Sequence, residues 1–110
     1  MAAAAASFSG ASSETAFVTC PSGFGFVAYT GTLTAGKIVV VGCAPEATSQ
    51  EFVLDTIDET RLEEITNEAG TAYSFGAPFQ VGINWRIALK ADASFVGSGT
   101  AIVTADPYGV

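Results

Sequence analysis

The chain has 110 residues, of which 49% are hydrophobic and only 14% are charged, and its formal net charge at pH 7 is −7. A chain of this length forms one domain around one core. Four basic residues against eleven acidic ones argue against nucleic-acid binding, which needs clustered Lys and Arg, and no apolar run reaches the ~18 residues of a membrane span. Because so few charges are available, we expect part of the apolar surface to be covered by a partner or by copies of the chain.

Residues 1–13, MAAAAASFSGASS, are low in complexity. They contain neither the positive segment nor the Leu/Val-rich stretch of a signal peptide. We interpret them as a flexible or partner-ordered N-terminal arm, followed by a single β-sandwich domain that spans residues 14–110. A plain disordered tail is the alternative interpretation of the arm.

The rest of the chain alternates with a period of two residues, which is typical of strands. Gly and Pro interrupt this pattern at short intervals, so it predicts an all-β fold, an antiparallel β-sandwich or flattened barrel of about seven or eight short strands. The expected strands outside the acidic segment lie, in chain order, at residues 15–20, 23–30, 37–43, 51–54, 71–75, 81–91 and 99–105.

Residues 55–70 have two interpretations. Their apolar residues share one side of a helix that Gly70 would close. The alternative is a loop followed by a strand at 61–66. We favour the strand, because the surrounding segments are all β.

The clearest alternation occurs at residues 81–91, where Trp85, Ile87 and Leu89 point to one side and Arg86 and Lys90 point to the other. This pattern predicts a half-buried antiparallel strand with one solvated face. The two basic residues then belong to the wet face of a sheet rather than to a basic site. We expect Arg86 to pair with a carboxylate, either within the sheet or across an interface.

The aromatic residues near this strand are candidates for contacts. Trp85 lies on its apolar face, so core packing is the favoured interpretation and a sugar-binding platform is the alternative. Phe75, Pro78 and Phe79 lie in a Gly/Pro-rich stretch that we interpret as an exposed loop. They would contact a partner or cap one end of the core.

The chain contains no histidine, which removes Ser-His-Asp and Cys-His arrangements and the commonest general base near neutral pH. Two cysteines without histidine also argue against structural zinc. We expect Cys20 and Cys43 to be reduced and buried, with a disulfide between them as the alternative.

Two stretches imitate phosphate-binding motifs. Residues 31–37 have the spacing of a P-loop, but Ile38 stands where Ser or Thr would hold magnesium, and a strand rather than a helix is expected to follow. Residues 23–28 imitate the dinucleotide fingerprint and also continue into strand-forming residues. We interpret the glycines of both stretches as strand and turn residues.

Eight of the eleven acidic residues lie between Glu46 and Glu68. Asp55, Asp58 and Glu59 offer carboxylates for calcium, but their spacing is not that of a calcium loop, so a solvated acidic face is the favoured interpretation. Paired carboxylates can hydrolyse glycosidic bonds, but a small domain with one Trp is a poor candidate for that cleft. We therefore assign no catalytic, cofactor-binding or metal-binding residues, and we expect no enzymatic activity and no cofactor.

The order of strands and turns resembles small β-sandwich virion proteins of tailed phages, over roughly residues 23–105. In that family an early hairpin of the type GTFxGTVTVE precedes a final strand pair of the type GxxYRVxxxxxxSGTxTV. The matching stretches here are GTLTAGKIVVV at 31–41, GTAYSFGAPF at 70–79, GINWRIAL at 82–89 and GSGTAIVT at 97–104. One departure is residues 45–50, PEATSQ, where such proteins often carry an Asp-Gly-Thr-Trp type of turn, and it leaves open which virion part this is.

The resemblance implies a structural component that self-associates and binds capsid or tail. Our main expectation is a non-enzymatic capsid decoration, or cement, protein on the virion surface, synthesised in the host cytoplasm. Its expected partners are the major capsid protein and copies of itself, as a homo-oligomer and preferably a trimer, without nucleic acid or membrane. The alternatives are a tail, connector or fibre component and, in another class, a carbohydrate- or calcium-binding β-module.

Overall fold

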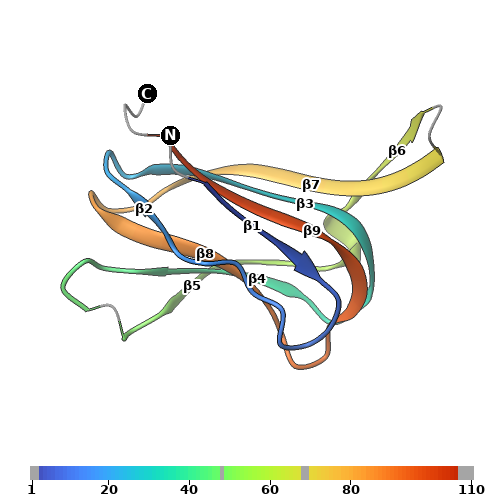
Figure 1. Cartoon of the computed structure of the whole chain (residues 1–110), viewed down its shortest axis with the longest axis horizontal. Helices are drawn as coiled ribbons and strands as arrows, with labels where there is room; N and C mark the ends of the chain where they lie inside the picture. The colour runs from blue at the N-terminus through green and yellow to red at the C-terminus, as the bar shows by residue number, and fades with distance from the viewer. Residues whose placement is uncertain (1–2, 48, 68–69, 107–110) are drawn as a thin grey trace.

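The computed structural model describes residues 3–47, 49–67 and 70–106. These residues form two antiparallel sheets that pack face to face, which confirms the predicted β-sandwich (Figure 1). The five-stranded sheet contains, in spatial order, β1 (Ala3–Phe8), β9 (Val96–Asp106), β3 (Phe24–Ala35), β7 (Gly70–Gln80) and β6 (Glu63–Asn67). The four-stranded sheet contains β2 (Val18–Cys20), β8 (Trp85–Ala91), β4 (Ile38–Cys43) and β5 (Phe52–Ile57).

Each strand expected from the sequence has a counterpart in one of the two sheets. The alternation of residues 81–91 becomes β8, with Ile87 and Leu89 fully buried. The apolar run at 37–43 becomes β4, which is paired on both sides, with β5 and β8. A strand with neighbours on both sides and little exposed surface favours β-branched residues, as found in this segment.

The N-terminal segment differs from the expected arm. Ala3–Phe8 form β1, which pairs along its whole length with β9, from Ala3 opposite Thr104 to Phe8 opposite Gly99. Phe8 is 1% exposed and packs in the core. We expected a flexible or partner-ordered arm. Residues 3–8 instead form a strand, which is ordered by pairing with β9 of the same chain. Alanine has little strand propensity. The side chain that fixes β1 to the core is Phe8.

The acidic segment contains a strand, as favoured from the sequence. A single 3₁₀ turn, η1 (Glu59–Arg61), precedes β6, and Asp58 caps it by accepting a hydrogen bond from the Thr60 amide. β6 forms a hairpin with β7, in which Glu63 lies opposite Ser74. Pairing with β7 outweighs the local helix propensity of this acidic stretch.

The stretch expected to be a Gly/Pro loop is instead the second half of β7. Residues 74–80 pair with β3, from Ser74 opposite Thr30 to Gln80 opposite Phe24. Among the described residues β6 covers β7 only over residues 70–74, so Pro78 lies on an open edge. Proline is tolerated there because its missing N–H leaves no hydrogen bond of the sheet unmade.

β2 is shorter than expected because a side chain takes part in the pairing. The amide of Thr15 donates to the carbonyl of Leu89 at 2.9 Å, and the Thr15 hydroxyl accepts from the Leu89 amide at 3.0 Å. The hydroxyl thus replaces a backbone carbonyl, and Thr15 is 3% exposed. Regular pairing with β8 begins only at Val18, opposite Ile87.

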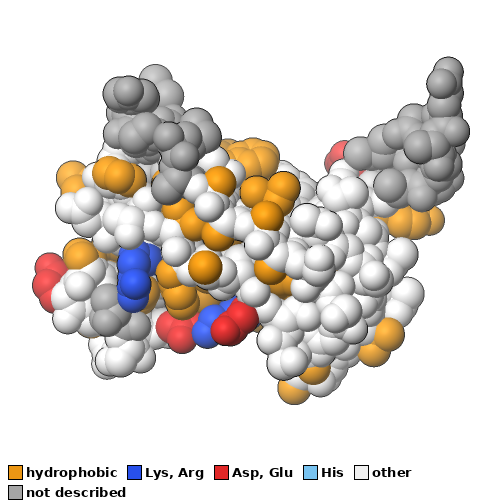
Figure 2. All heavy atoms as spheres, in the orientation of Figure 1, with side chains coloured by type: hydrophobic (Ala, Val, Ile, Leu, Met, Phe, Trp, Pro, Cys, Tyr) orange, Lys and Arg blue, Asp and Glu red, His pale blue; other side chains and the backbone are white. Residues whose placement is uncertain are grey.

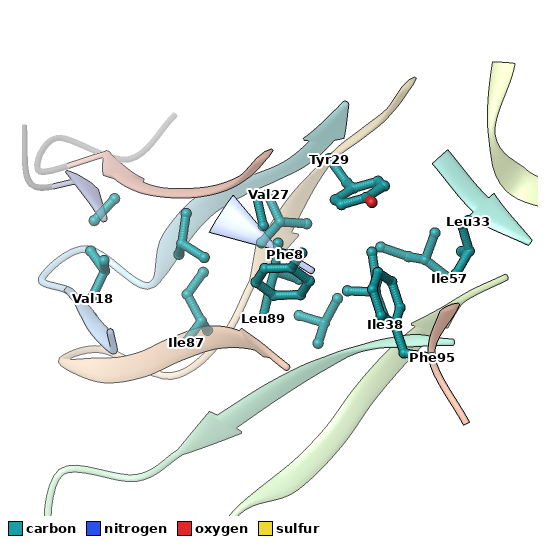
Figure 3. Close-up of a cluster of buried hydrophobic side chains, with 14 of the residues drawn as sticks. Phe8, Val18, Val27, Tyr29, Leu33, Ile38, Ile57, Ile87, Leu89 and Phe95 are labelled. Carbon is teal, nitrogen blue, oxygen red and sulfur yellow. The ribbon is translucent and has the colours of Figure 1, made fainter. Parts of the chain in front are cut away.

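The core fills the space between the sheets (Figure 3). At one end Phe8, Tyr29 and Phe95 form an aromatic trio with ring centroids 5.9 to 6.5 Å apart. The Tyr29 hydroxyl donates to the Thr32 carbonyl at 2.7 Å, so its polar atom is satisfied. Burial raises the pKa of Tyr29. The other fully buried large side chains are Ile38, Ile57, Ile87, Leu89, Val27, Val40, Val103, Cys20 and Cys43.

Candidate interaction surfaces

The outer face of the five-stranded sheet is built from paired rows of residues. Strand register places three rows across β1, β9, β3 and β7, in that order. The rows are Ala3–Thr104–Phe26–Pro78, Ala5–Ile102–Ala28–Gly76 and Ser7–Thr100–Thr30–Ser74. These side chains point away from the core, because the residues between them, such as Val27 and Val103, are buried. We call this surface the uncharged face.

The uncharged face contains no ionisable acidic or basic side chain. Residues 3–8, 24–35, 70–80 and 96–105 include no Asp, Glu, Lys or Arg. Figure 2 shows orange and white over β1, β9 and β3, while red and blue side chains gather over the four-stranded sheet below. The acidic residues described in the same sheet are Asp106, the last residue of β9, which lies opposite Phe24 beyond the three rows, and Glu63 and Glu64 on the outermost strand β6.

Two of the three rows are largely apolar and form the apolar half of the uncharged face. Phe26 is 45% exposed and Ile102 is 40% exposed, on neighbouring strands. The Phe26 ring lies over Gly76, whose missing Cβ would be only 3.1 Å from the end of the ring. Because Gly76 has no side chain, the Phe26 ring can lie close to the backbone of β7 and does not project far from the sheet.

The third row begins the hydroxyl half of the uncharged face. It continues towards the end of β3 with Thr32, opposite Ser98, and with Thr34. The Thr32 hydroxyl donates to the Ser98 carbonyl at 3.3 Å and accepts from the Ser98 amide at 3.1 Å. The Thr34 hydroxyl donates to the Val96 carbonyl at 3.3 Å. These two hydroxyls therefore have hydrogen-bond partners in the neighbouring strand β9.

The outer face of the four-stranded sheet has a different composition. Lys90 forms ion pairs with Glu51 at 2.8 Å and with Glu14 at 3.7 Å. The Phe17 ring lies between the two cations of β8, with Arg86 5.3 Å and Lys90 5.6 Å from its centroid. Attraction between cations and the ring face adds to these contacts. Lys90 therefore has its partners within the chain, and hydrogen bonding to Glu51 is the main cause that raises the pKa of Lys90.

Arg86 does not have the expected carboxylate within its own chain. The ion pairs of the described residues join Arg61 to Asp55 and Lys90 to Glu14 and Glu51, but none includes Arg86. Its Nε atom is buried and makes no hydrogen bond with the described part of the chain. A carboxylate across an interface stays a prediction.

Trp85 is half-buried and lies outside the cluster of buried core residues, so the expected core packing is not found. Its ring packs on Phe52 with centroids 6.0 Å apart and an interplanar angle of 32°. A side chain at Gly82 would collide with the Trp85 indole, so Gly82 lies directly against the ring. The neighbouring Ile83 is 70% exposed.

Two of the carboxylates considered as calcium ligands, Asp55 and Asp58, form hydrogen bonds within the chain. Arg61 Nη1 donates to both carboxylate oxygens of Asp55 at 2.8 Å, and its guanidinium lies 4.5 Å from the Phe75 ring centroid. The hydrogen bond from Arg61 is the main cause that lowers the pKa of Asp55. Hydrogen bonds from Thr60 lower the pKa of Asp58. Among the described residues no group of three His, Cys, Asp or Glu side chains is placed to hold a metal ion.

The two glycine-rich stretches that imitate phosphate-binding motifs form a strand and its turns. Residues 23–28 and 31–35 belong to β3 and the turn before it, and Gly36 (φ +76°) makes the turn into β4, as interpreted from the sequence.

Cys20 and Cys43 are buried and unpaired. They lie opposite Trp85 and Arg86, which are consecutive residues of β8, so their side chains point to opposite faces of the sheet. Burial raises the pKa of Cys20.

A groove of about 420 Å³ lies where β7 separates from β3. Pairing of these strands ends at Thr30 opposite Ser74, and β3 continues to Ala35 without β7 beside it. The residues that line the groove are Thr32, Leu33, Thr34, Glu59, Thr60, Leu62 and Tyr73. Glu59 is its only charged lining residue in the described part of the chain, and the lining brings together no candidate acid–base pair.

The comparisons with known proteins identify no relative. No family model matches the chain, and neither a curated protein nor a solved structure matches it. Within the residues that the structure describes, no helix is long and apolar enough to cross a membrane. The interaction surfaces must therefore be interpreted from their own chemistry.

The sequence pointed to single residues, whereas the structure points to a surface. Arg86 and Lys90 were assigned to the wet face of a sheet and Trp85 to the core, and the structure packs them against Phe17, Glu51 and Phe52 respectively. The uncharged face was not expected. Its signal in the sequence was the absence of charge from four separate stretches, and only the register places those stretches side by side.

Proposed function

We propose that this chain is a non-enzymatic structural protein of a tailed-phage virion, a capsid decoration protein that binds the major capsid lattice and copies of itself. The observation that carries this proposal is the uncharged face, a broad outer sheet surface with exposed Phe26 and Ile102 in a chain of net charge −7. Large exposed apolar patches on small domains mark interaction sites. The resemblance of residues 23–105 to virion β-sandwiches supports the choice of partner.

The distribution of reactive side chains supports a structural rather than a chemical role. Asp55 binds Arg61, Asp58 caps η1, and Lys90 binds two glutamates. Each of these groups stabilises the fold through a partner in the same chain. Such a molecule acts through the surface that it buries, at about 25 cal/mol for each Å² of apolar area removed from water.

The proposed mechanism is mechanical stabilisation of the shell. A small protein that buries apolar surface across the junction between capsomers must release that surface before the capsomers can separate. The free energy of its binding then adds to the free energy of separating the capsomers. The protein needs no cofactor for this action.

The test uses purified capsids that lack the protein. We expect the chain to co-sediment with them and to raise the temperature at which they release their genome, monitored with a DNA-binding dye. An unrelated acidic β-sandwich of similar size serves as the control. Absence of both co-sedimentation and heat protection would contradict the proposal. Co-sedimentation with isolated tails alone would instead assign the protein to the tail.

A further inference from the structure

The charges of the molecule restrict what can cover the uncharged face. Two copies of a chain of net charge −7 repel each other wherever their acidic surfaces meet. The acidic residues of the described chain lie in loops and η1, on β5 and β6, beside β8 and at Asp106, the last residue of β9, so that none lies within the three rows of the uncharged face. Contact through the uncharged face therefore keeps the carboxylates of two copies apart.

The same pattern argues against a partner of opposite charge. A basic partner is recognised best by carboxylates placed opposite its cations, which also accelerate association. This chain has acidic groups in abundance, and the three rows of the uncharged face contain none of those in the described residues. An interface without charge suits a partner that bears the same charge as the chain itself.

The layout of the uncharged face is also compatible with self-pairing. In a two-fold contact the same patch occurs on both sides, so apolar surface must meet apolar surface. The two apolar rows are adjacent, and Ile102 and Ala28 form the central pair of the second row, on the neighbouring strands β9 and β3. A two-fold axis through this point brings the apolar half of one copy onto that of the other. Sheets pack in this way at about 10 Å separation.

We infer that the uncharged face is covered by a second copy of this chain, in a two-fold pair of five-stranded sheets centred near Ile102. This inference builds on the proposed function, which includes copies of the chain as partners, and adds the surface and the symmetry. The paired unit leaves the outer faces of both four-stranded sheets, and the exposed Ile83, open to the lattice. It differs from the trimer implied by the resemblance.

Light scattering coupled to size exclusion tests the pair without any capsid. We expect a particle of twice the 11.2 kDa chain mass, with a Kd of about 10 µM or tighter for an interface of standard size. Ile102→Lys and Ile102→Glu should each weaken pairing at least about tenfold, because each variant places like charges opposite one another across the axis. Ala5→Lys, at an exposed position of the edge strand, should weaken it without removing any core contact.

The matched control is Val53→Lys. Val53 is a β-branched residue on an edge strand of the other sheet and is 65% exposed, and its replacement should leave pairing unchanged. Equal parts of the Ile102→Lys and Ile102→Glu chains should form a mixed pair, since opposite charges then meet at the axis. Circular dichroism and thermal unfolding confirm that each variant is folded.

Three results would overturn the inference: a wild-type chain that stays monomeric, a trimer unaffected by either Ile102 variant, or pairing lost equally in Val53→Lys. Failure of the charge-swapped chains to pair with each other would overturn the two-fold geometry. Capsid binding is measured separately. A chain that pairs but does not bind capsids would contradict the proposed function alone, and a monomer that binds capsids would contradict this inference alone.

Discussion

The two outer faces of the sandwich follow the same alternation but differ in what they place outward. On the four-stranded sheet the outward positions of β8 carry Arg86 and Lys90, which pack on Phe17, and Lys90 pairs with Glu14 and Glu51. On the five-stranded sheet the outward positions carry Phe, Ile, Ala, Thr and Ser. On the first surface Lys90 forms ion pairs within the chain, whereas the three rows of the second surface contain no charged group that could form one.

This difference shows how a small domain with few charges distributes them. The chain places charged groups on the outer face of one sheet while it leaves three neighbouring rows of the other sheet without any. Ion pairs at the surface contribute little to stability, but they keep a face hydrated and monomeric. The face without charges is the one on which association removes apolar area from water at little electrostatic cost.

The largest effect on stability is expected from Phe8→Ala. This substitution tests whether β1 is fixed in the sheet that carries the uncharged face. Phe8 is fully buried between Tyr29 and Phe95, so its loss should lower the free energy of unfolding by about 3–5 kcal/mol. Urea unfolding followed by fluorescence measures it. Ser7→Ala, at the exposed neighbouring position, is the control. A loss below about 1 kcal/mol would mean that β1 is not anchored in the core.

A smaller effect is expected from Lys90→Met, which removes the ion pairs of the charged face. Lys90 is 30% exposed and its partners Glu51 and Glu14 are 38% and 60% exposed, so we expect a loss of about 1 kcal/mol or less. The loss should shrink in about 0.5 M salt, because salt screens exposed pairs. Lys37→Met, at another exposed lysine, is the control. An unchanged loss in high salt would assign the effect to packing on Phe17.

The pH dependence of stability should come partly from Asp55. Arg61 lowers the pKa of Asp55 in the folded chain, so the pair stabilises the fold above the unfolded pKa of about 3.9. That stabilisation is lost as the pH falls below about 4, when the carboxylate takes up a proton. Asp55→Asn should therefore be less stable than wild type at pH 7, and the difference should shrink as the pH falls below the unfolded pKa of about 3.9. Glu59→Gln is the control, and parallel pH curves for Asp55→Asn and wild type would contradict the assignment.

The smallest effect is expected from Thr30→Val on the hydroxyl half of the uncharged face. Thr30 is exposed, and valine keeps its shape and strand propensity, so the free energy of unfolding should change by less than about 0.5 kcal/mol. Pairing of the chain should become slightly tighter, because the apolar half grows by one position. Thermal unfolding and light scattering measure the two effects. Weaker pairing would show that the hydroxyls themselves make the contact.

Much of the fold could be predicted from local pattern. The alternation at 81–91 and the β-branched run at 37–43 predicted β8 and β4, because a strand exposes successive side chains to opposite sides. Residues 76–80 were misread as a loop, since the sequence does not show that Pro78 lies on an unpaired edge. Ala3–Phe8 were misread as an arm, since their strand depends on β9, about 90 residues later.

The interaction surface shows where local pattern stops being sufficient. The alternation of apolar residues by itself predicted an all-β chain. Composition by itself showed few charges, no histidine and surplus apolar surface. Only the tertiary structure decided that Ala5, Ile102, Ala28 and Gly76 lie in one row. The reason is physical: alternation is a property of neighbouring residues, whereas a row across a sheet depends on pairing between segments far apart in the chain.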